Sequence, residues 1–312
     1  MILSVSRRTD IPNYYFDWFL NRIREGFLYV RNPMNPHQIS RIPLTPELVD
    51  CIVFWTKNPE PMMARLGELK DYMYYIQFTL TPYGRDIEPN LPDKRNCLIP
   101  TFQELSRRIG KERVIWRYDP ILITERYTMS CHEEAFQEIA EHLNGFTDRV
   151  VVSFVDMYAK TKRNMGKCPP KLMTEENQKA LASKLASVAA ANHMEIESCA
   201  EAVDLSEAGI AHGSCIDRRL IESLLGCRLE GTKDKNQRPE CGCMESVEVG
   251  AYHTCRNGCR YCYANFSDEK VAEHVSLYDP ASPLLCGHIG DGDVITERKV
   301  RSLKKMQMSL FD

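Results

Sequence analysis

In Cys51-Ile-Val-Phe-Trp-Thr-Lys-Asn-Pro59, residues 51–55 are an apolar run of strand length, and polar residues and a proline follow it. A helical pattern follows it at residues 61–69. A strand without polar alternation is typical of a parallel sheet whose two faces are both covered by helices. This stretch therefore predicts one β-then-α unit, with its polar residues at the carboxyl end of the strand.

The same unit recurs on both sides of this stretch. Apolar runs of strand length lie at residues 2–6, 74–79, 113–117, 149–153, 194–198 and 247–252, and helical patterns lie at 14–23, 102–109, 133–143 and 174–191. Repeated β-then-α units predict an α/β fold, a full or partial (β/α) barrel with parallel strands. We expect residues 1–290 to form this single barrel-type domain, with a cysteine motif near its C-terminal end, and residues 291–312 to form a C-terminal tail.

Polar residues follow six of the predicted strands. They include Thr9, Lys57, Thr81, Asp119, Asp156 and Glu201. One such residue alone would be a helix cap or part of a turn. Ligands of parallel barrels bind at the carboxyl ends of the strands, so six such positions in register predict one site at the mouth of the barrel.

The cysteine motif is Cys255-Arg-Asn-Gly-Cys259-Arg-Tyr-Cys262, with three and then two residues between the thiols. Three thiolates fill three positions around a metal centre and leave one open, whereas a structural zinc site is closed by four protein ligands. The spacing, with no fourth cysteine nearby, favours an open site that performs chemistry. A zinc site that takes its fourth ligand from His253 or Cys286 is the alternative.

This motif resembles the signature of the radical S-adenosylmethionine (SAM) superfamily. In that superfamily three thiolates hold a four-iron, four-sulfur (4Fe-4S) cluster, and SAM binds the fourth iron. The resemblance implies that the reduced cluster cleaves SAM and that the 5′-deoxyadenosyl radical removes a hydrogen atom from a substrate. It also implies an electron donor, such as flavodoxin or ferredoxin, as a partner.

The strand ends extend the resemblance to the spore photoproduct lyase branch of the superfamily. The matching stretches are Thr9-Asp-Ile-Pro12, Thr56-Lys-Asn-Pro59, Ile87-Glu-Pro89 and Arg117-Tyr-Asp-Pro-Ile121. The cysteine motif opens the chain in those lyases and comes last here, so the chain resembles a circular permutation in which residues 247–265 supply the opening strand and loop. The chain is also similar, over essentially its whole length, to the family called domain of unknown function 1848.

The resemblance implies roles for several single residues. Lys57 and Thr9 are expected to contact the SAM carboxylate, since an ammonium offsets the negative charge of thiolates and ligand. Tyr261 and Tyr263 flank the last cysteine of the motif, as do the lyase tyrosines that relay a hydrogen atom; packing beside the cluster is the alternative. Arg7 stands where the lyases place a hydrogen-donating cysteine, so thymine-dimer repair by that mechanism is not expected.

A second group of cysteines precedes the motif: Cys199, Cys215, Cys241 and Cys243. The sequence Cys241-Gly-Cys243 places two sulfurs on one flexible turn, where they can share a metal. The other two would complete four ligands, which predicts a second iron-sulfur cluster or a structural zinc ion. Ordinary reduced cysteines without a metal are the alternative.

The composition indicates a globular chain with metal chemistry. The 312 residues are 43% hydrophobic and carry a formal net charge of −3, so no basic field covers the whole molecule. Thirteen cysteines, an odd number, favour reduced thiols and metal binding over a disulfide framework. We find no apolar run long enough to span a membrane and no signal peptide, so we expect a cytoplasmic protein without membrane association.

The last residues suggest a further partner. Gln307-Met-Ser-Leu-Phe311 resembles the short peptide with which bacterial DNA enzymes dock on the replication sliding clamp. This would make DNA the substrate, unless Leu310 and Phe311 instead fold back over the barrel. A protein of a different class, a non-enzymatic iron-sulfur or zinc-stabilised nucleic-acid or partner-binding protein, is the alternative to the radical SAM enzyme.

Overall fold

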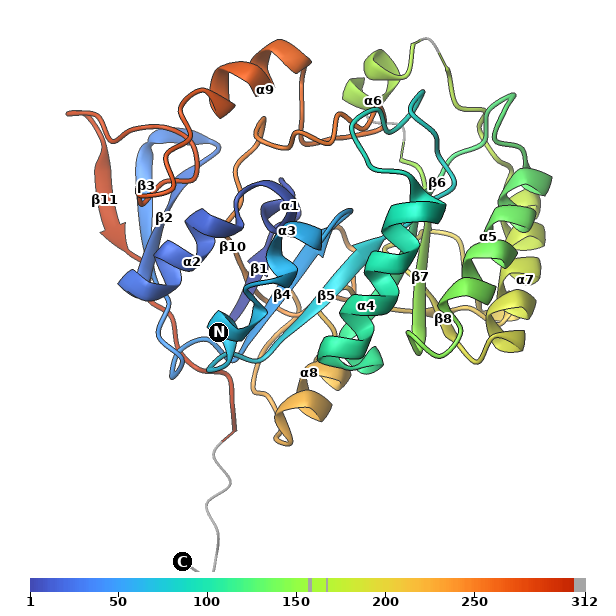
Figure 1. Cartoon of the computed structure of the whole chain (residues 1–312), viewed down its shortest axis with the longest axis horizontal. Coiled ribbons are helices and arrows are strands. Elements are labelled where there is room, and N and C mark those ends of the chain that lie inside the picture. The colour runs from blue at the N-terminus through green and yellow to red at the C-terminus, as the bar shows by residue number, and fades with distance from the viewer. Residues whose placement is uncertain (157–158, 167, 306–312) are drawn as a thin grey trace, which may run out of the picture.

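The computed structural model describes residues 1–156, 159–166 and 168–305 (Figure 1). Its main sheet has eight strands in these residues, and every neighbouring pair is parallel. In spatial order they are β10 (Val247–Glu248), β1 (Ile2–Val5), β4 (Cys51–Thr56), β5 (Tyr74–Thr79), β6 (Val114–Ile121), β7 (Arg149–Phe154), β8 (Glu195–Ser198) and β9 (Ala211–His212). The predicted α/β fold with parallel strands is confirmed, in the form of a partial barrel.

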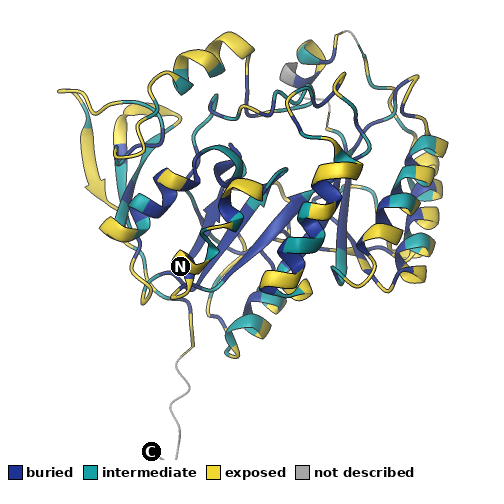
Figure 2. Cartoon of the chain, viewed as in Figure 1, coloured by how far each residue is buried: buried dark blue, intermediate teal, exposed yellow. Residues whose placement is uncertain are grey.

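The central strands are buried on both faces, as their apolar sequences predict. Ile52 and Phe54 of β4 belong to the larger core, whereas Cys51 and Val53 point to the other face and join a smaller core. Alternate residues of a strand point to opposite faces, so this division follows directly from the period of two. Figure 2 shows the strands as buried and the outer surfaces of the flanking helices as exposed.

Helices between the strands cover the larger core. The longer ones are α2 (Phe16–Glu25), α4 (Ile99–Ile109), α5 (Met129–Leu143) and α7 (Glu175–Ala191), and α4, α5 and α7 lie along one side of the sheet in Figure 1. Two begin at threonine caps: Thr128 accepts a hydrogen bond from Cys131 N and Thr174 accepts one from Asn177 N, both at 3.2 Å.

Two predicted helices are each divided in the structure. The one expected at 14–23 is α1 (Ile11–Tyr14) followed by α2, because Tyr15 has an extended φ of −138° between them. The one expected at 61–69 is α3 (Glu60–Met63) followed by the short 3₁₀ helix η1 (Leu66–Leu69). There the Arg65 N–H bonds to Met62 O, only three residues back, which tightens the turn and ends the α-helix.

Several elements were not predicted. The strands β2 (Phe27–Asn32) and β3 (Asn35–Pro43) form an antiparallel hairpin, and β11 (Val294–Glu297) pairs with β3. The remaining short elements are α6 (Ala159–Asn164), α8 (Arg218–Leu225), α9 (Asp268–Val275), the π-helix η2 (Lys94–Leu98) and the 3₁₀ turns η3 (Lys111–Arg113) and η4 (Ser206–Ala208). The apolar run of β2 is only four residues long, at 27–30, and β3 begins with four exposed residues, so the sequence shows no clear sign of a strand pair.

The last strand of the main sheet lies beside the first. β10 pairs with β1 through Leu3 and Val247, and this is the position that the circularly permuted order requires. The strand predicted at 247–252 is shorter than expected: β10 ends at Glu248, although Val249 N–H still donates to Ser4 O of β1 at 3.1 Å. The chain then crosses the carboxyl ends of the strands, where Figure 1 draws it in orange.

The described part of the C-terminal region runs along the outside of the sheet. Residues 298–305 are mostly exposed, but Leu303 is buried and its N–H donates to Asp50 at 2.7 Å. The residues of the predicted clamp-binding peptide, 307–311, lie outside the described residues. Within the part that the structure describes, no helix combines the length and hydropathy that crossing a membrane requires.

Candidate functional site

A cavity of about 990 Å³ lies at the carboxyl ends of the parallel strands. Its walls include the strand-end residues Thr9, Lys57 and Asp119, together with both tyrosines of the cysteine motif. The thiols of both predicted groups also line it: Cys255, Cys259 and Cys262 of the motif, and Cys199, Cys215, Cys241 and Cys243 of the second group. The fold therefore brings both cysteine groups and four of the six predicted strand-end residues to one cavity, whereas Thr81 and Glu201 do not line it.

The loop at 255–262 is held at the strand ends by a hydrogen bond between two buried residues, Asp10 and Asn257. The sequence did not predict this contact. The Asp10 carboxylate accepts hydrogen bonds from Asn257 Nδ2 and from Lys57 N, each at 2.9 Å. Asn257 Oδ1 in turn accepts one from Tyr14 OH at 2.8 Å. Burial raises the pKa of Asp10, although these hydrogen bonds oppose the rise. The sequence feature that could have indicated this role is the position of Asn257 between the first two cysteines of the motif.

Gly258 allows the same loop to pack closely on the residues after β5. Its φ of +69° lies in the left-handed region, and a Cβ there would stand 2.9 Å from Asn90 Nδ2 and 3.0 Å from Pro89 Cγ. Asn90 Nδ2 also donates to Arg256 O at 2.8 Å. The glycine between the first two cysteines is therefore required by both its backbone angle and its surroundings.

The three thiols of the motif are partly buried, and burial raises the pKa of two of them. Burial raises the pKa of Cys259 to about 12, although the Lys57 ammonium lowers it. Burial also raises the pKa of Cys255 well above its ordinary value. In the absence of a metal, these thiols therefore favour the protonated form. A bound cation would displace the thiol proton and favour the thiolate instead.

Neither of the two cysteine groups matches a preformed site for a single ion. Over residues 1–156, 159–166 and 168–305, no three His, Cys, Asp or Glu side chains are placed to hold one metal ion. A four-iron cluster differs from a single ion because each thiolate binds its own iron. Three thiols of one loop around an open cavity are thus the donor set that such a cluster uses.

Two buried polar atoms beside the motif have no hydrogen-bond partner among the described residues: Thr9 Oγ1 and Asn265 Oδ1. Thr9 lines the large cavity, and Asn265 donates through Nδ2 to Cys255 O at 2.8 Å. A buried polar atom without a partner is costly, and such atoms in a cavity wall indicate a missing ligand. These residues therefore fit a bound group that offers hydrogen-bonding atoms, as SAM does.

Glu88 joins two of the predicted site residues. Its buried carboxylate accepts a hydrogen bond from Lys57 Nζ at 2.8 Å and contacts Lys94 Nζ and Tyr261 OH. Burial raises its pKa, but the two ammonium groups outweigh that effect and lower the pKa to about 2. The sequence reasoning quoted Glu88 within a matching stretch but assigned it no role.

Lys57 and the two tyrosines differ in how they are held. The Lys57 ammonium lies 5.5 Å from the centre of the Tyr261 ring, and with three donors it can bind a ligand as well as Glu88. Tyr263 OH instead donates to Arg7 O at 2.6 Å, and its side chain is 44% exposed. Both tyrosines border the cavity, and their predicted part in hydrogen transfer stays a prediction.

Arg7, expected from the sequence resemblance to replace the lyases' hydrogen-donating cysteine, is held by the cavity wall. Its Nε lies 3.6 Å from Glu248 Oε2, its Nη2 donates to Ser246 Oγ at 3.0 Å, and its guanidinium stacks 5.5 Å from the Trp55 ring centre. These contacts give Arg7 a fixed place beside the cysteines of the second group.

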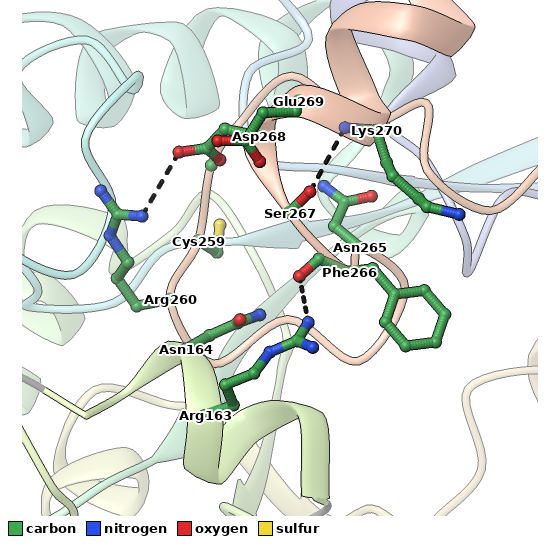
Figure 3. A pocket seen from close by; sticks show the side chains of 11 residues that line it. Arg163, Asn164, Cys259, Arg260, Asn265, Phe266, Ser267, Asp268, Glu269 and Lys270 are labelled. Atoms are coloured by element: carbon green, nitrogen blue, oxygen red, sulfur yellow. Dashed lines mark hydrogen bonds and ion pairs between the residues drawn. The ribbon is translucent and has the colours of Figure 1, made fainter.

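A second pocket, of about 600 Å³, lies against the loop on the side of α6 and α9 (Figure 3). Cys259 lines it together with Asn265, whose Oδ1 has no hydrogen-bond partner among the described residues. Arg163 closes one side by donating to Phe266 O, and Arg260 pairs with Asp268 at 3.6 Å on the other. Cys259 thus borders both pockets.

Comparison with known proteins gives one family match. The family described as domain of unknown function (DUF1848) matches residues 2–264, a span that includes the cysteine motif. No curated protein matches the chain. A solved structure of a proposed alpha-L-fucosidase from Bacteroides thetaiotaomicron aligns at 11% identity over 50% of this chain, with a TM-score of 0.27. The alignment covers 66% of that structure, slightly under two thirds, and a likeness this low carries no argument.

Proposed function

This chain belongs to the domain of unknown function 1848 family, and from that premise we propose that it is a radical SAM enzyme. One observation carries the proposal. The loop with Cys255, Cys259 and Cys262 crosses the carboxyl ends of parallel strands, and its three thiols line the same cavity as Thr9 and Lys57. A metal centre on this loop would face a substrate bound in the cavity.

The three cysteines would hold the four-iron, four-sulfur cluster and leave its fourth iron for SAM. When bound and reduced, this group supplies the electron that cleaves the carbon–sulfur bond of SAM to give the 5′-deoxyadenosyl radical. The protein's part is to bind, orient and shield the reactants. The spacing of the cysteines and the absence of a fourth ligand within the loop support this assignment.

The residues around the loop have separate tasks in this proposal. Lys57 places a positive charge beside Cys259, which offsets the negative charge of thiolates and of the SAM carboxylate. Thr9 offers its partnerless hydroxyl to the ligand. Glu88 stays ionised and holds both the Lys57 ammonium and the Tyr261 hydroxyl proton in place.

The test is SAM cleavage by the full chain. Protein reconstituted anaerobically with iron and sulfide, then given dithionite and SAM, should be brown and should release 5′-deoxyadenosine, measured by liquid chromatography. The Cys255→Ala, Cys259→Ala, Cys262→Ala triple variant should lose both properties. Cys97→Ala is the matched control, because Cys97 is exposed and lies outside both cysteine groups.

Two results would contradict the proposal. Cleavage of SAM by the triple variant would remove the motif from the chemistry. A loaded wild-type protein that binds metal but leaves SAM intact under these conditions would instead support the non-enzymatic, metal-stabilised binding protein.

A further inference from the structure

The second group of thiols converges from three separate segments. Cys199 follows β8, Cys215 follows β9, and Cys241 and Cys243 lie in the connection between α8 and β10. Cys215, Cys241 and Cys243 are 5%, 7% and 2% exposed, and Cys199 is partly buried. All four are free cysteines that border the large cavity.

The sulfurs of this group are neighbours, and one pair is in direct contact. Cys199 Sγ lies 3.0 Å from Cys215 Sγ. The Cys215 thiol is also hydrogen-bonded to Cys243, and Cys243 to Cys241. The four thiols therefore form a chain of neighbours, in which every sulfur has at least one other sulfur as its partner.

Two glycines let the segments approach this closely. A Cβ on Gly242, between the paired cysteines, would lie 3.1 Å from Gly213 O and 3.4 Å from Ser214 Cβ. A Cβ on Gly213 would lie 2.5 Å from Glu197 Oε2, a contact too short for real atoms. The backbone on both sides of the cluster is thus built for direct contact between the segments that carry the thiols.

Donor groups point at the sulfurs. Arg117 Nη1 lies 2.8 Å from Cys215 Sγ, and Ile216 N–H donates to Cys243 Sγ at 3.4 Å. The Arg117 side chain is buried, and it also binds Asp119 and Gln77. Such outer hydrogen-bond donors to sulfur are typical of metal-bound thiolates.

We infer that Cys199, Cys215, Cys241 and Cys243 bind one thiophilic metal ion, Zn²⁺, as a tetrathiolate site distinct from the 255–262 loop. Sulfurs in direct contact suit a single ion, because the irons of a four-iron cluster hold its thiolates farther apart. Binding replaces four S–H bonds by four S–Zn bonds and releases four protons, which leaves a charge of −2. Arg117 and Arg7 lie beside the group to offset that charge.

Without a metal, the four thiols are not arranged around one point where an ion could bind, since no such arrangement exists among the described residues. Binding therefore exchanges the S–H···S hydrogen bonds for metal bonds and closes the chain of sulfurs around one point. This inference does not depend on the proposed function, since none of the four cysteines belongs to the radical SAM motif.

The experiment uses the full chain carrying Cys255→Ala, Cys259→Ala and Cys262→Ala, which removes the first site. Plasma mass spectrometry of this purified triple variant should find about one zinc ion per chain. Adding Cys241→Ala and Cys243→Ala should remove the zinc, whereas adding Cys97→Ala and Cys168→Ala should not. Iron retained in place of zinc, or no metal in the triple variant, would overturn the inference.

A second measurement covers the case in which the Cys241, Cys243 variant does not fold. The triple variant, stripped of metal, is titrated with Co²⁺ and followed by absorption. Intense visible bands and thiolate-to-cobalt charge transfer, both lost on adding Zn²⁺, are expected for a tetrahedral tetrathiolate site. A titration without these bands would refute the site, and neither readout involves SAM.

Discussion

Glu88 holds several side chains of the site in place through hydrogen bonds and ion pairs. Its replacement should therefore weaken all of these contacts and destabilise the fold. It accepts hydrogen bonds from Lys57 Nζ at 2.8 Å and Thr81 Oγ1 at 3.1 Å, and it contacts Lys94 and Tyr261. Breaking a buried ion pair on one side typically costs about 3–5 kcal/mol. Glu88→Gln should lower the free energy of unfolding by about 3 kcal/mol or more, as measured in urea.

A surface carboxylate provides the control for this substitution. Glu104 pairs with Arg108 on the exposed side of α4, and exposed ion pairs contribute little to stability. Glu104→Gln should leave the urea midpoint unchanged. If Glu88→Gln were equally neutral, the buried carboxylate would not be holding Lys57 and Lys94 as described.

The pKa of Glu88 gives a dependence on pH. Burial raises this pKa, but Lys57 and Lys94 lower it from its ordinary 4.5 to about 2 in the folded protein. A depressed carboxyl pKa stabilises the fold above the unfolded value and loses that effect as pH falls through the folded value. The stability difference between wild type and Glu88→Gln should therefore be constant above pH 4.5 and shrink from there toward pH 2.

Urea unfolding of both proteins at a series of pH values checks this dependence. A difference that stayed constant from neutral pH to below pH 4 would mean that Glu88 titrates normally. That outcome would also weaken the assignment of Lys57 as a fixed positive charge beside the cysteine loop.

At the scale of elements, the loop 255–262 depends on Asn257 for its attachment. Asn257 Nδ2 donates to Asp10 at 2.9 Å, and Asn257 Oδ1 accepts from Tyr14 OH at 2.8 Å. Leaving buried partners unsatisfied costs about 1–3 kcal/mol, and local opening would increase accordingly. Asn257→Ala should speed tryptic cleavage after Arg256 and Arg260 by about tenfold, measured by mass spectrometry.

Asn96→Ala is the matched control for this proteolysis, because Asn96 is an exposed asparagine outside the loop. Cleavage after Arg256 and Arg260 should then occur at the wild-type rate. An Asn257→Ala protein as resistant as wild type would show that the loop is held by its other contacts, such as Asn90 to Arg256 O.

At the scale of the whole molecule, segments from the C-terminal third of the chain pack and pair with the N-terminal strand and helices. β10 pairs with β1, Tyr15 OH donates to Thr254 O at 2.5 Å, and Trp18 Nε1 donates to Ser282 O at 2.8 Å. These bonds join parts of the chain that are far apart in the sequence. The cysteine loop therefore reaches the mouth of the sheet only when both regions are folded together, because its strand and its anchors come from opposite ends of the described chain.

The sequence by itself determined the central strands and the cysteine loop. Residues 74–79 were predicted as a strand with the bounds that β5 has, and β4 and β7 extend their predictions by one residue each. Continuous apolar runs report burial on both faces, and this signal is local. The spacing of Cys255, Cys259 and Cys262 is equally local, so the sequence alone predicts an open donor set there, and that role stays a prediction.

Only the tertiary structure decided which remote residues support the site. Nothing near Glu88 in the sequence indicated its contact with Tyr261, and nothing near Asp10 indicated its bond to Asn257. The pairing of β11 with β3 could not be predicted from the sequence either. All four residues of β11 are exposed, so they show no apolar pattern that indicates a strand. Such contacts depend on packing between segments distant in the chain, and periodicity within one segment carries no information about which distant partner will meet it.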